Sequence, residues 1–202
     1  MYKNILKENG LPNEWDFFSS SLQILRHGWF PTSHQHKLAK IIEDYEIKNA
    51  LEIGAWLGES TIFLAQRLEL VVSIDTWEGS DAHKDGTYGV SIDNKSNIDS
   101  LSLLKEQFLT NCEQYKKTIC PIQMDSRNLN QIKLPMFDLI YIDGEHQYDF
   151  VKNDIEISLS LIKPGGIICG DDYCDSWPGV SKAVNELILD FRVDQGFWWS
   201  EG

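Results

Sequence analysis

Titratable side chains follow two apolar runs in the second half of the chain. The run FDLIYI, residues 137 to 142, is followed at once by DGEHQYD, and the run GIICG leads into Asp171 and Asp172. In an open α/β sheet, ligands lie beyond the carboxyl ends of the strands, and neighbouring strands are about 4.8 Å apart. We therefore expect the carboxylates of Asp143, Asp171 and Asp172 to converge.

Three converging carboxylates predict a metal site. Bringing three anions together is costly unless a cation or shared protons relieve the repulsion. A divalent ion that prefers oxygen ligands, Mg²⁺ in the first place, would relieve this repulsion. Its expected ligands are Asp143, Asp171 and Asp172. His146 follows Asp143 by three residues, close to one helical turn, which points it toward the same place. Its unperturbed pKa of about 6.5 suits a general base, so His146 and Asp143 are the candidate catalytic residues.

The segment ALEIGAWLGEST predicts a ligand-binding turn. A strand runs into Gly54 to Gly58, and a helix begins near Glu59; glycines at such a turn let backbone N–H groups approach a ligand. The spacing is GxxxG, which departs from the GxGxxG of dinucleotide sites. Asp75 ends the next apolar run, where a carboxylate can accept hydrogen bonds from both hydroxyls of a ribose. The pattern favours a nucleoside without a pyrophosphate. For the glycines alone, an ordinary tight turn is the alternative.

Short apolar runs alternate with segments of helical period, which is typical of a parallel sheet with crossover helices. The runs are NALEIG (49 to 54), LVVSID (70 to 75), TICPIQM (118 to 124), FDLIYID (137 to 143) and GIICGD (166 to 171). Helical stripes are expected over 101 to 115, over 148 to 162, where Pro164-Gly165-Gly166 ends the helix, and over 180 to 191. FRVDQ and FWWS near the C-terminus predict a terminal hairpin.

Two segments lie outside this order. Residues 1 to 46 are expected to form a helical preamble that covers the core or packs against a second copy in a homo-oligomer. We expect His34 and His36 in it to be solvated, because no partner ligand lies nearby in the sequence. Residues 78 to 97 are too long for an ordinary connection and predict a lid or binding loop.

Composition excludes several classes of function. The chain has 202 residues, of which 42% are hydrophobic, enough for a single globular domain with one sizeable core. Its net charge is −13, and no Lys/Arg cluster offsets it, so nucleic acid and anionic membranes are not expected as partners. The four cysteines show no CxxC or zinc-like spacing, and the N-terminus lacks the apolar core of a signal peptide. No run approaches the roughly 18 apolar residues of a membrane span. We expect a soluble, cytoplasmic protein.

Six segments together resemble the class I S-adenosylmethionine-dependent methyltransferases. They are LEIGAWLGEST, SIDTWEGS, MDSRNL, FDLIYIDGEHQYD, LIKPGG and GDDY. Within that superfamily the chain resembles the small-molecule and sugar O-methyltransferases that are methyltransferase family 24-like. The resemblance implies a Rossmann-like, doubly wound α/β fold over residues 47 to 202, with helices on both faces of a seven-stranded, mostly parallel sheet whose last strand is antiparallel.

The resemblance also implies roles for individual residues. Asp75 would hold the ribose of S-adenosylmethionine, and the acids at 143, 171 and 172 would hold Mg²⁺, which lowers the pKa of an acceptor hydroxyl. The remaining expected cofactor contacts are Glu52, Gly54, Trp56, Gly58 and Ser60 around the amino-acid part, and Trp77, Asp125 and Ser126 around the adenine. Structural roles remain as alternatives: a buried pairing for Glu52, core packing for Trp77, and helix capping for Asp125 and Ser126.

Three functions are compatible with these residues. The first is an in-line transfer of a methyl group to a hydroxyl of a small molecule or sugar, with the protein supplying orientation, deprotonation of the acceptor and exclusion of water. The second is a metal-dependent hydroxylation or another reaction on the same fold. The third is a non-catalytic ligand-binding domain.

Overall fold

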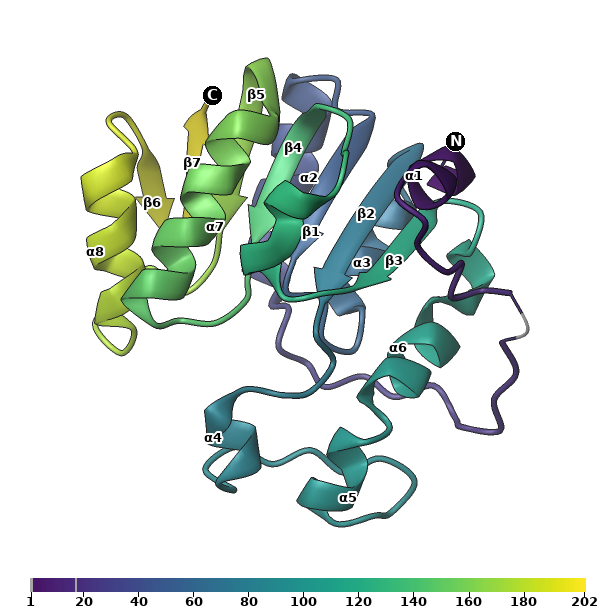
Figure 1. Ribbon diagram of the computed structural model, residues 1–202. Helices are drawn as coiled ribbons and strands as arrows, with labels where there is room; N and C mark the ends of the chain where they lie inside the picture. Colours follow the sequence, from purple (N-terminus) through teal and green to yellow (C-terminus); the bar gives the residue numbers. More distant parts are fainter. Residues whose placement is uncertain (1, 17) are drawn as a thin grey trace.

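The computed structural model describes residues 2–16 and 18–202. Its strands form one 7-stranded sheet in the order β3-β2-β1-β4-β5-β7-β6 (Figure 1). The strands are β1 (Asn49–Ile53), β2 (Leu70–Asp75), β3 (Ile119–Gln123), β4 (Phe137–Ile142), β5 (Ile162–Gly170), β6 (Arg192–Asp194) and β7 (Phe197–Glu201). The pairs from β3 to β5 are parallel, and β7 is antiparallel to both β5 and β6. The predicted sheet and terminal hairpin are confirmed.

Helices cover both faces of the sheet, so the molecule has three layers (Figure 1). On one face lie α2 (Thr32–Asp44), α3 (Glu59–Ala65) and α6 (Leu104–Cys112). On the other lie α1 (Tyr2–Glu8), η2 (Ser126–Gln131), α7 (Tyr148–Leu161) and α8 (Pro178–Leu187). Along β1, Ala50 packs in the first layer, whereas Leu51 and Ile53 pack in the second, as the alternation of side chains in a strand requires. Burial on both faces explains the continuous hydrophobicity of the strands.

Three predicted helix boundaries are wrong. Pro164-Gly165-Gly166 lies inside β5, because the chain pairs with β4 from Ile162 onward and then bulges, with Gly165 in the left-handed region at φ 76°. The stripe over 101 to 115 is divided among α5 (Asn97–Leu101), α6 and the 3₁₀ turn η1 (Glu113–Tyr115). Helix α8 ends at Leu187, since the chain turns there to extended backbone.

The N-terminal segment packs on the same two core layers. Tyr2, Ile5 and Leu6 of α1 lie in one, and α2 contributes to the other. Between these helices the chain crosses α6, where the buried side chain of Asn111 accepts from the N–H of Leu25 at 2.9 Å and donates to its carbonyl at 2.7 Å. Among the described residues of the preamble, helix is therefore confined to its two ends. Within 2–16 and 18–202, no helix has the length and hydropathy to cross a bilayer.

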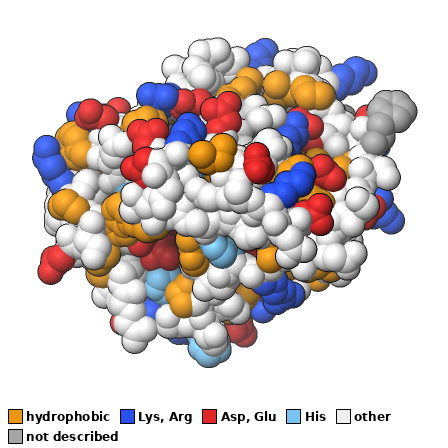
Figure 2. All heavy atoms as spheres, turned by 90° about the horizontal axis from the view of Figure 1, so that it is seen from below, with side chains coloured by type: hydrophobic (Ala, Val, Ile, Leu, Met, Phe, Trp, Pro, Cys, Tyr) orange, Lys and Arg blue, Asp and Glu red, His pale blue; other side chains and the backbone are white. Residues whose placement is uncertain are grey.

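Both the glycine turn and the acidic segments lie at one edge of the sheet. The parallel strands end at the lower edge in Figure 1, and the short helices α4 (Asp81–Lys84) and α5 hang below it. Figure 2 looks at the molecule from that side and shows acidic and histidine side chains in a hollow between hydrophobic ones.

Candidate active site

A cavity of about 840 Å³ occupies this edge of the sheet, within the range of roughly 300 to 1,000 Å³ that is common for small-ligand sites. It extends from the turn after β1 to the acidic residues after β4 and β5. The residues predicted from the sequence that line it are Gly54, Trp56, Ser60, Asp75, Asp125, Ser126, Asp143, His146, Asp171 and Asp172. The fold thus brings both predicted patterns into one cavity.

The turn after β1 requires its two glycines for different reasons. Gly54 has φ 90°, and a Cβ there would lie 2.0 Å from the carbonyl oxygen of Asp143. Gly58 has φ 86°, and a Cβ there would lie 2.5 Å from Sγ of Cys112 in α6. Gly54 therefore keeps β1 close to the end of β4 beside the cavity, whereas Gly58 does not line the cavity and lets α3 start against α6.

Asp75 ties this turn to the end of β2. Its Oδ2 accepts from the N–H groups of Ala55 at 2.9 Å and Trp56 at 2.8 Å, and its Oδ1 accepts from that of Trp77 at 2.7 Å. Burial raises the pKa of Asp75, and these backbone donors oppose the rise. The carboxylate lines the cavity as expected, but most of its acceptor capacity is used by the protein itself.

Glu52 and Trp77 lie outside the lining of the cavity. The carboxylate of Glu52 is 0% exposed and accepts hydrogen bonds from Ser60, Thr61 and Ser73. Trp77 is buried against Phe108 and donates from Nε1 to the carbonyl of Trp56 at 3.0 Å. Instead of the direct cofactor contacts expected from the sequence, the geometry gives both residues a supporting place behind the turn.

The segment after β3 lines the end of the cavity that lies away from the acidic residues after β4 and β5. Asp125 caps η2, accepting from the N–H of Arg127 at 2.9 Å, and its carboxylate also pairs with the guanidinium of Arg127, which lowers the pKa of Asp125. Asp154 of α7 was not singled out in the sequence, yet it lines the cavity together with Ser126. Burial raises its pKa to about 6. In the sequence, an acid at position 154 lies next to the buried stripe of the helix predicted over 148 to 162, and that placement could have indicated Asp154.

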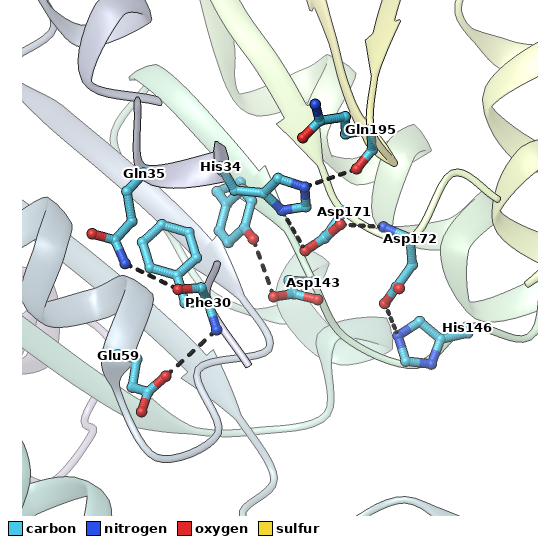
Figure 3. A network of polar contacts seen from close by, with 10 residues as sticks. Phe30, His34, Gln35, Glu59, Asp143, His146, Asp171, Asp172 and Gln195 are labelled. Atoms are coloured by element: carbon cyan, nitrogen blue, oxygen red, sulfur yellow. Dashed lines mark hydrogen bonds and ion pairs between the residues drawn. The ribbon is translucent and has the colours of Figure 1, made fainter. Parts of the chain in front are cut away.

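Asp143, His146 and Asp172 form the group that could hold a metal ion. One ligand atom from each lies within 4.8 Å of the others. Nε2 of His146 lies 2.7 Å from Oδ2 of Asp172 (Figure 3), and the hydroxyl of Tyr141 donates to Asp143 at 3.1 Å. Two carboxylates and an imidazole suit a first-row divalent ion such as Mn²⁺ as well as Mg²⁺.

The charges of this group perturb one another. Burial raises the pKa of Asp143 to about 8, and the negative charges of Asp171 and Asp172 add to the rise. For His146, burial alone would lower the pKa, but the hydrogen bond to Asp172 and the nearby carboxylates outweigh it and raise the pKa. Without a bound cation, a proton on Asp143 and the hydrogen bond between His146 and Asp172 reduce the repulsion that the sequence predicted.

Asp171, the third predicted ligand, lies beside Asp143 but is not one of the three residues of this group, and it pairs with His34 (Figure 3). Nδ1 of His34 lies 2.9 Å from Asp171, and its Nε2 lies 2.9 Å from the carbonyl oxygen of Gln195. Both partners accept hydrogen bonds, so both ring nitrogens carry hydrogen and His34 is an imidazolium. Burial would lower its pKa, but these contacts raise it.

The expectation that His34 is solvated is wrong, since the residue is only 5% exposed. Its partner lies 137 positions away in the chain, which is why the sequence around His34 showed no ligand. His36, two positions further along α2, is exposed as expected.

Comparison with known proteins agrees with this arrangement. A family model described as "Methyltransferase domain" matches residues 51–173. An uncharacterized protein of Acanthamoeba polyphaga mimivirus is 30% identical over 144 residues, and the match spans 60% of this chain and 60% of that relative's length.

Solved structures show the same fold. A putative caffeoyl-CoA O-methyltransferase from Staphylococcus aureus has a TM-score of 0.59 at 14% identity over 98% of this chain and 88% of that one. A calicheamicin methyltransferase has 0.58 at 17% identity, over 88% and 80%. An O-methyltransferase from Bacillus cereus, solved with S-adenosylhomocysteine, has 0.52 at 20% identity, over 98% and 87%. With the family match over most of the sheet, the chain belongs to the methyltransferase domain family, and residues 51–173 form a methyltransferase domain of the S-adenosylmethionine-dependent class.

Proposed function

We propose that the protein transfers the methyl group of S-adenosylmethionine to a hydroxyl oxygen of a small-molecule acceptor, with a divalent metal ion held by Asp143 and Asp172 beside His146. The observation that carries the proposal is that these three groups, with ligand atoms within 4.8 Å of one another, share one cavity with the turn at Gly54. The Bacillus cereus neighbour is an O-methyltransferase with S-adenosylhomocysteine bound, which supports the assignment of donor and acceptor atom.

The residues of the cavity fit the donor. The glycine turn, Asp75 and the Asp125-Ser126 pair line one end, where they would take the amino-acid, ribose and adenine parts in that order along the strand ends. The lining is rich in carboxylates, which favours a ligand with a positive sulfonium. No pyrophosphate-binding turn is needed for such a ligand.

The acidic end would activate the acceptor. A bound divalent ion lowers the pKa of a hydroxyl that it coordinates. Asp143 and Asp172 would hold that ion by their carboxylates, and Trp177, stacked on His146 at 4.2 Å, holds the imidazole in place. His146 either completes the ligand set or takes the acceptor proton, and its position beside Asp172 serves both roles.

Two variants separate these roles. Asp172→Asn should raise the Mg²⁺ or Mn²⁺ concentration needed for half-maximal methyl transfer. The thermal shift with S-adenosylhomocysteine should stay, because Asp172 lies outside the proposed cofactor end of the cavity. At 100 times its Kd the ligand stabilises the fold by about 2.7 kcal/mol, which such an assay detects. His146→Gln should lower kcat/KM by about 10²- to 10⁴-fold if it is the base. If it is a ligand instead, its loss should be relieved by excess metal.

The matched control is Asp175→Asn, which removes an exposed carboxylate from the same loop without touching the cavity. It should leave both metal dependence and rate unchanged. Methyl transfer that survives both a chelator and Asp172→Asn would show that the acidic group is not a metal site.

A further inference from the structure

Six of the aromatic side chains that line the cavity contact one another in sequence from the N-terminal segment to the loop after β5, and we name them the aromatic wall. They are His27, Trp29, Trp56, His83, Tyr88 and Trp177. They come from the crossing N-terminal segment, the turn after β1, the 78–97 loop and the loop after β5. Side chains from such separate segments meet only in the folded chain.

The wall is continuous and leads to the proposed metal group. Trp29 stacks on Trp56 at 5.6 Å with an interplanar angle of 10°, and Trp56 lies 4.4 Å from His83. Tyr88 bridges from His83, at 5.7 Å, to Trp177, at 6.3 Å. Because Trp177 in turn stacks on His146, a flat ring against the wall would lie beside the residues that activate a hydroxyl.

Trp29 remains available for such a ring. It is 50% exposed although it lines the cavity. An indole that is half exposed in a cavity can pack against the ring of a ligand, and one such aromatic pair contributes about 0.5 to 1.5 kcal/mol beyond the area it buries.

His83 adds a polar contact that the protein itself leaves unused. Its Nδ1 accepts from the N–H of Ser80 at 3.3 Å, so the neutral ring carries its hydrogen on Nε2. That Nε2 is buried and has no hydrogen-bond partner among the described residues. A buried donor without a partner costs roughly 1 to 3 kcal/mol, and an oxygen of a bound ligand would remove this cost.

The charge of the lining restricts the ligand further. Around the wall lie the carboxylates of Glu59, Glu78, Asp81, Glu145, Asp171 and Asp172. Among the described residues of the lining, the cationic side chains are Lys84 and Arg127, and Arg127 is paired with Asp125 at the far end. A phosphate or diphosphate on the acceptor would meet these six carboxylates against the single ammonium of Lys84, so the net charge of the lining repels it.

We propose that the aromatic wall is the acceptor-binding surface and that it selects an uncharged hydroxylated ring over the same ring carrying a phosphate. The inference rests on the proposed function and goes beyond it, because it names the class of acceptor. It also sets this chain apart from the similar structure of a TDP-rhamnose 3'-O-methyltransferase, whose named substrate carries a diphosphate.

The test uses matched ligand pairs on the protein saturated with S-adenosylhomocysteine and Mg²⁺. One pair is methyl rhamnoside and TDP-rhamnose, and the other is 3,4-dihydroxybenzyl alcohol and its phosphate ester. Calorimetry should give the uncharged member of at least one pair a Kd at least tenfold lower than that of its phosphorylated partner. The pair that binds identifies the ring as a sugar or a phenol.

Variants of the wall and of its charge test the two parts of the inference. Trp29→Ala should weaken binding of the uncharged ring about 5- to 10-fold, as loss of one stacking pair predicts, and Trp29→Phe should restore most of it. His83→Phe keeps the ring and removes the Nε2 donor, so it should also weaken binding. Glu78→Lys should reduce the ratio of Kd between the phosphorylated and the uncharged member of a pair. Glu43→Lys, at an exposed acid outside the cavity, should leave that ratio unchanged.

The outcomes distinguish this inference from the proposed function. Equal or tighter binding of the phosphorylated members, or no binding of either ring, overturns the inference even when S-adenosylhomocysteine binds and methyl transfer to some hydroxyl is measured. Failure to bind S-adenosylhomocysteine at all would instead count against the proposed function.

Discussion

Glu52 offers a test of how the interior behind the glycine turn is held together. Its carboxylate is fully buried, and three hydroxyls, those of Ser60, Thr61 and Ser73, donate to it. Burial raises its pKa from 4.5 to about 7, although the three donors act in the opposite direction. The folded protein therefore holds a proton at Glu52 over a pH range in which the unfolded chain has released it.

The sign of the effect on stability follows from this difference. A raised pKa in the folded state contributes stability that is present below about pH 4.5 and is lost as the pH rises through about 7. The difference between 4.5 and about 7, at about 1.4 kcal/mol for each pKa unit, amounts to roughly 3 kcal/mol. Glu52→Gln does not titrate, so relative to the wild type its free energy of unfolding should rise by that amount between about pH 4.5 and about pH 8.

The glutamine fits the same hydrogen bonds. Its carbonyl accepts from one or two hydroxyls, and its amide donates to the rest, because a hydroxyl is both donor and acceptor. Urea unfolding of both proteins, followed by fluorescence in steps of pH, measures the difference. Glu69→Gln is the control, since it removes one negative charge from an exposed position.

Parallel pH curves for the wild type and Glu52→Gln would refute the reasoning. A second readout concerns the cofactor: because Glu52 does not line the cavity, the Kd of S-adenosylhomocysteine should stay within about threefold at about pH 8. A much larger loss of affinity for S-adenosylhomocysteine would support the direct contact between Glu52 and the cofactor that the sequence predicted.

Three further changes test the supports of the site. Gly54→Ala should abolish the thermal shift with S-adenosylhomocysteine, because its Cβ would meet the Asp143 carbonyl at 2.0 Å, whereas Gly10→Ala, with φ 63° and open space around it, should cost only about 1 to 2 kcal/mol of unfolding free energy. His34→Ala should cost about 3 to 5 kcal/mol in urea unfolding, since it removes the imidazole that pairs with the largely buried carboxylate of Asp171, and the exposed His36→Ala should stay within about 0.5 kcal/mol. Asn111→Ala removes the hydrogen bonds to Leu25 and to the Leu57 carbonyl, so trypsin should cleave after Arg26 faster than in the wild type; equal cleavage rates would show that the crossing segment is held elsewhere.

Much of the fold could be predicted from local patterns. The five parallel strands were predicted because strands covered on both faces are continuously apolar, a pattern visible in a few adjacent residues. The placement of Asp143 and Asp172 at one edge follows from the same fact, since acids that end parallel strands share an edge. The boundary at Ile162 was missed because a bulged strand and a helix end use the same Pro-Gly signals.

The partners of individual side chains depend on contacts between distant segments. Leu38 of α2 packs in the core as expected of an apolar helix face, but nothing in the residues around His34 on the same helix indicates that it meets Asp171. The aromatic wall also depends on contacts between distant segments. Trp29, Trp56 and Trp177 lie in segments without hydrophobic periodicity, and the paths of such segments depend on distant contacts such as those of Asn111.

The physical reason is a difference in range. Hydrophobic periodicity records which face of an element is buried, and that is a property of neighbouring residues. Asp172 joins the proposed metal group, whereas Asp171 pairs with His34, and this difference depends on a histidine that the fold brings from 137 positions away. Local patterns are therefore enough to establish the sheet and the edge that carries the chemistry, whereas the choice of groups that face the cavity at that edge arises only when the whole chain has folded.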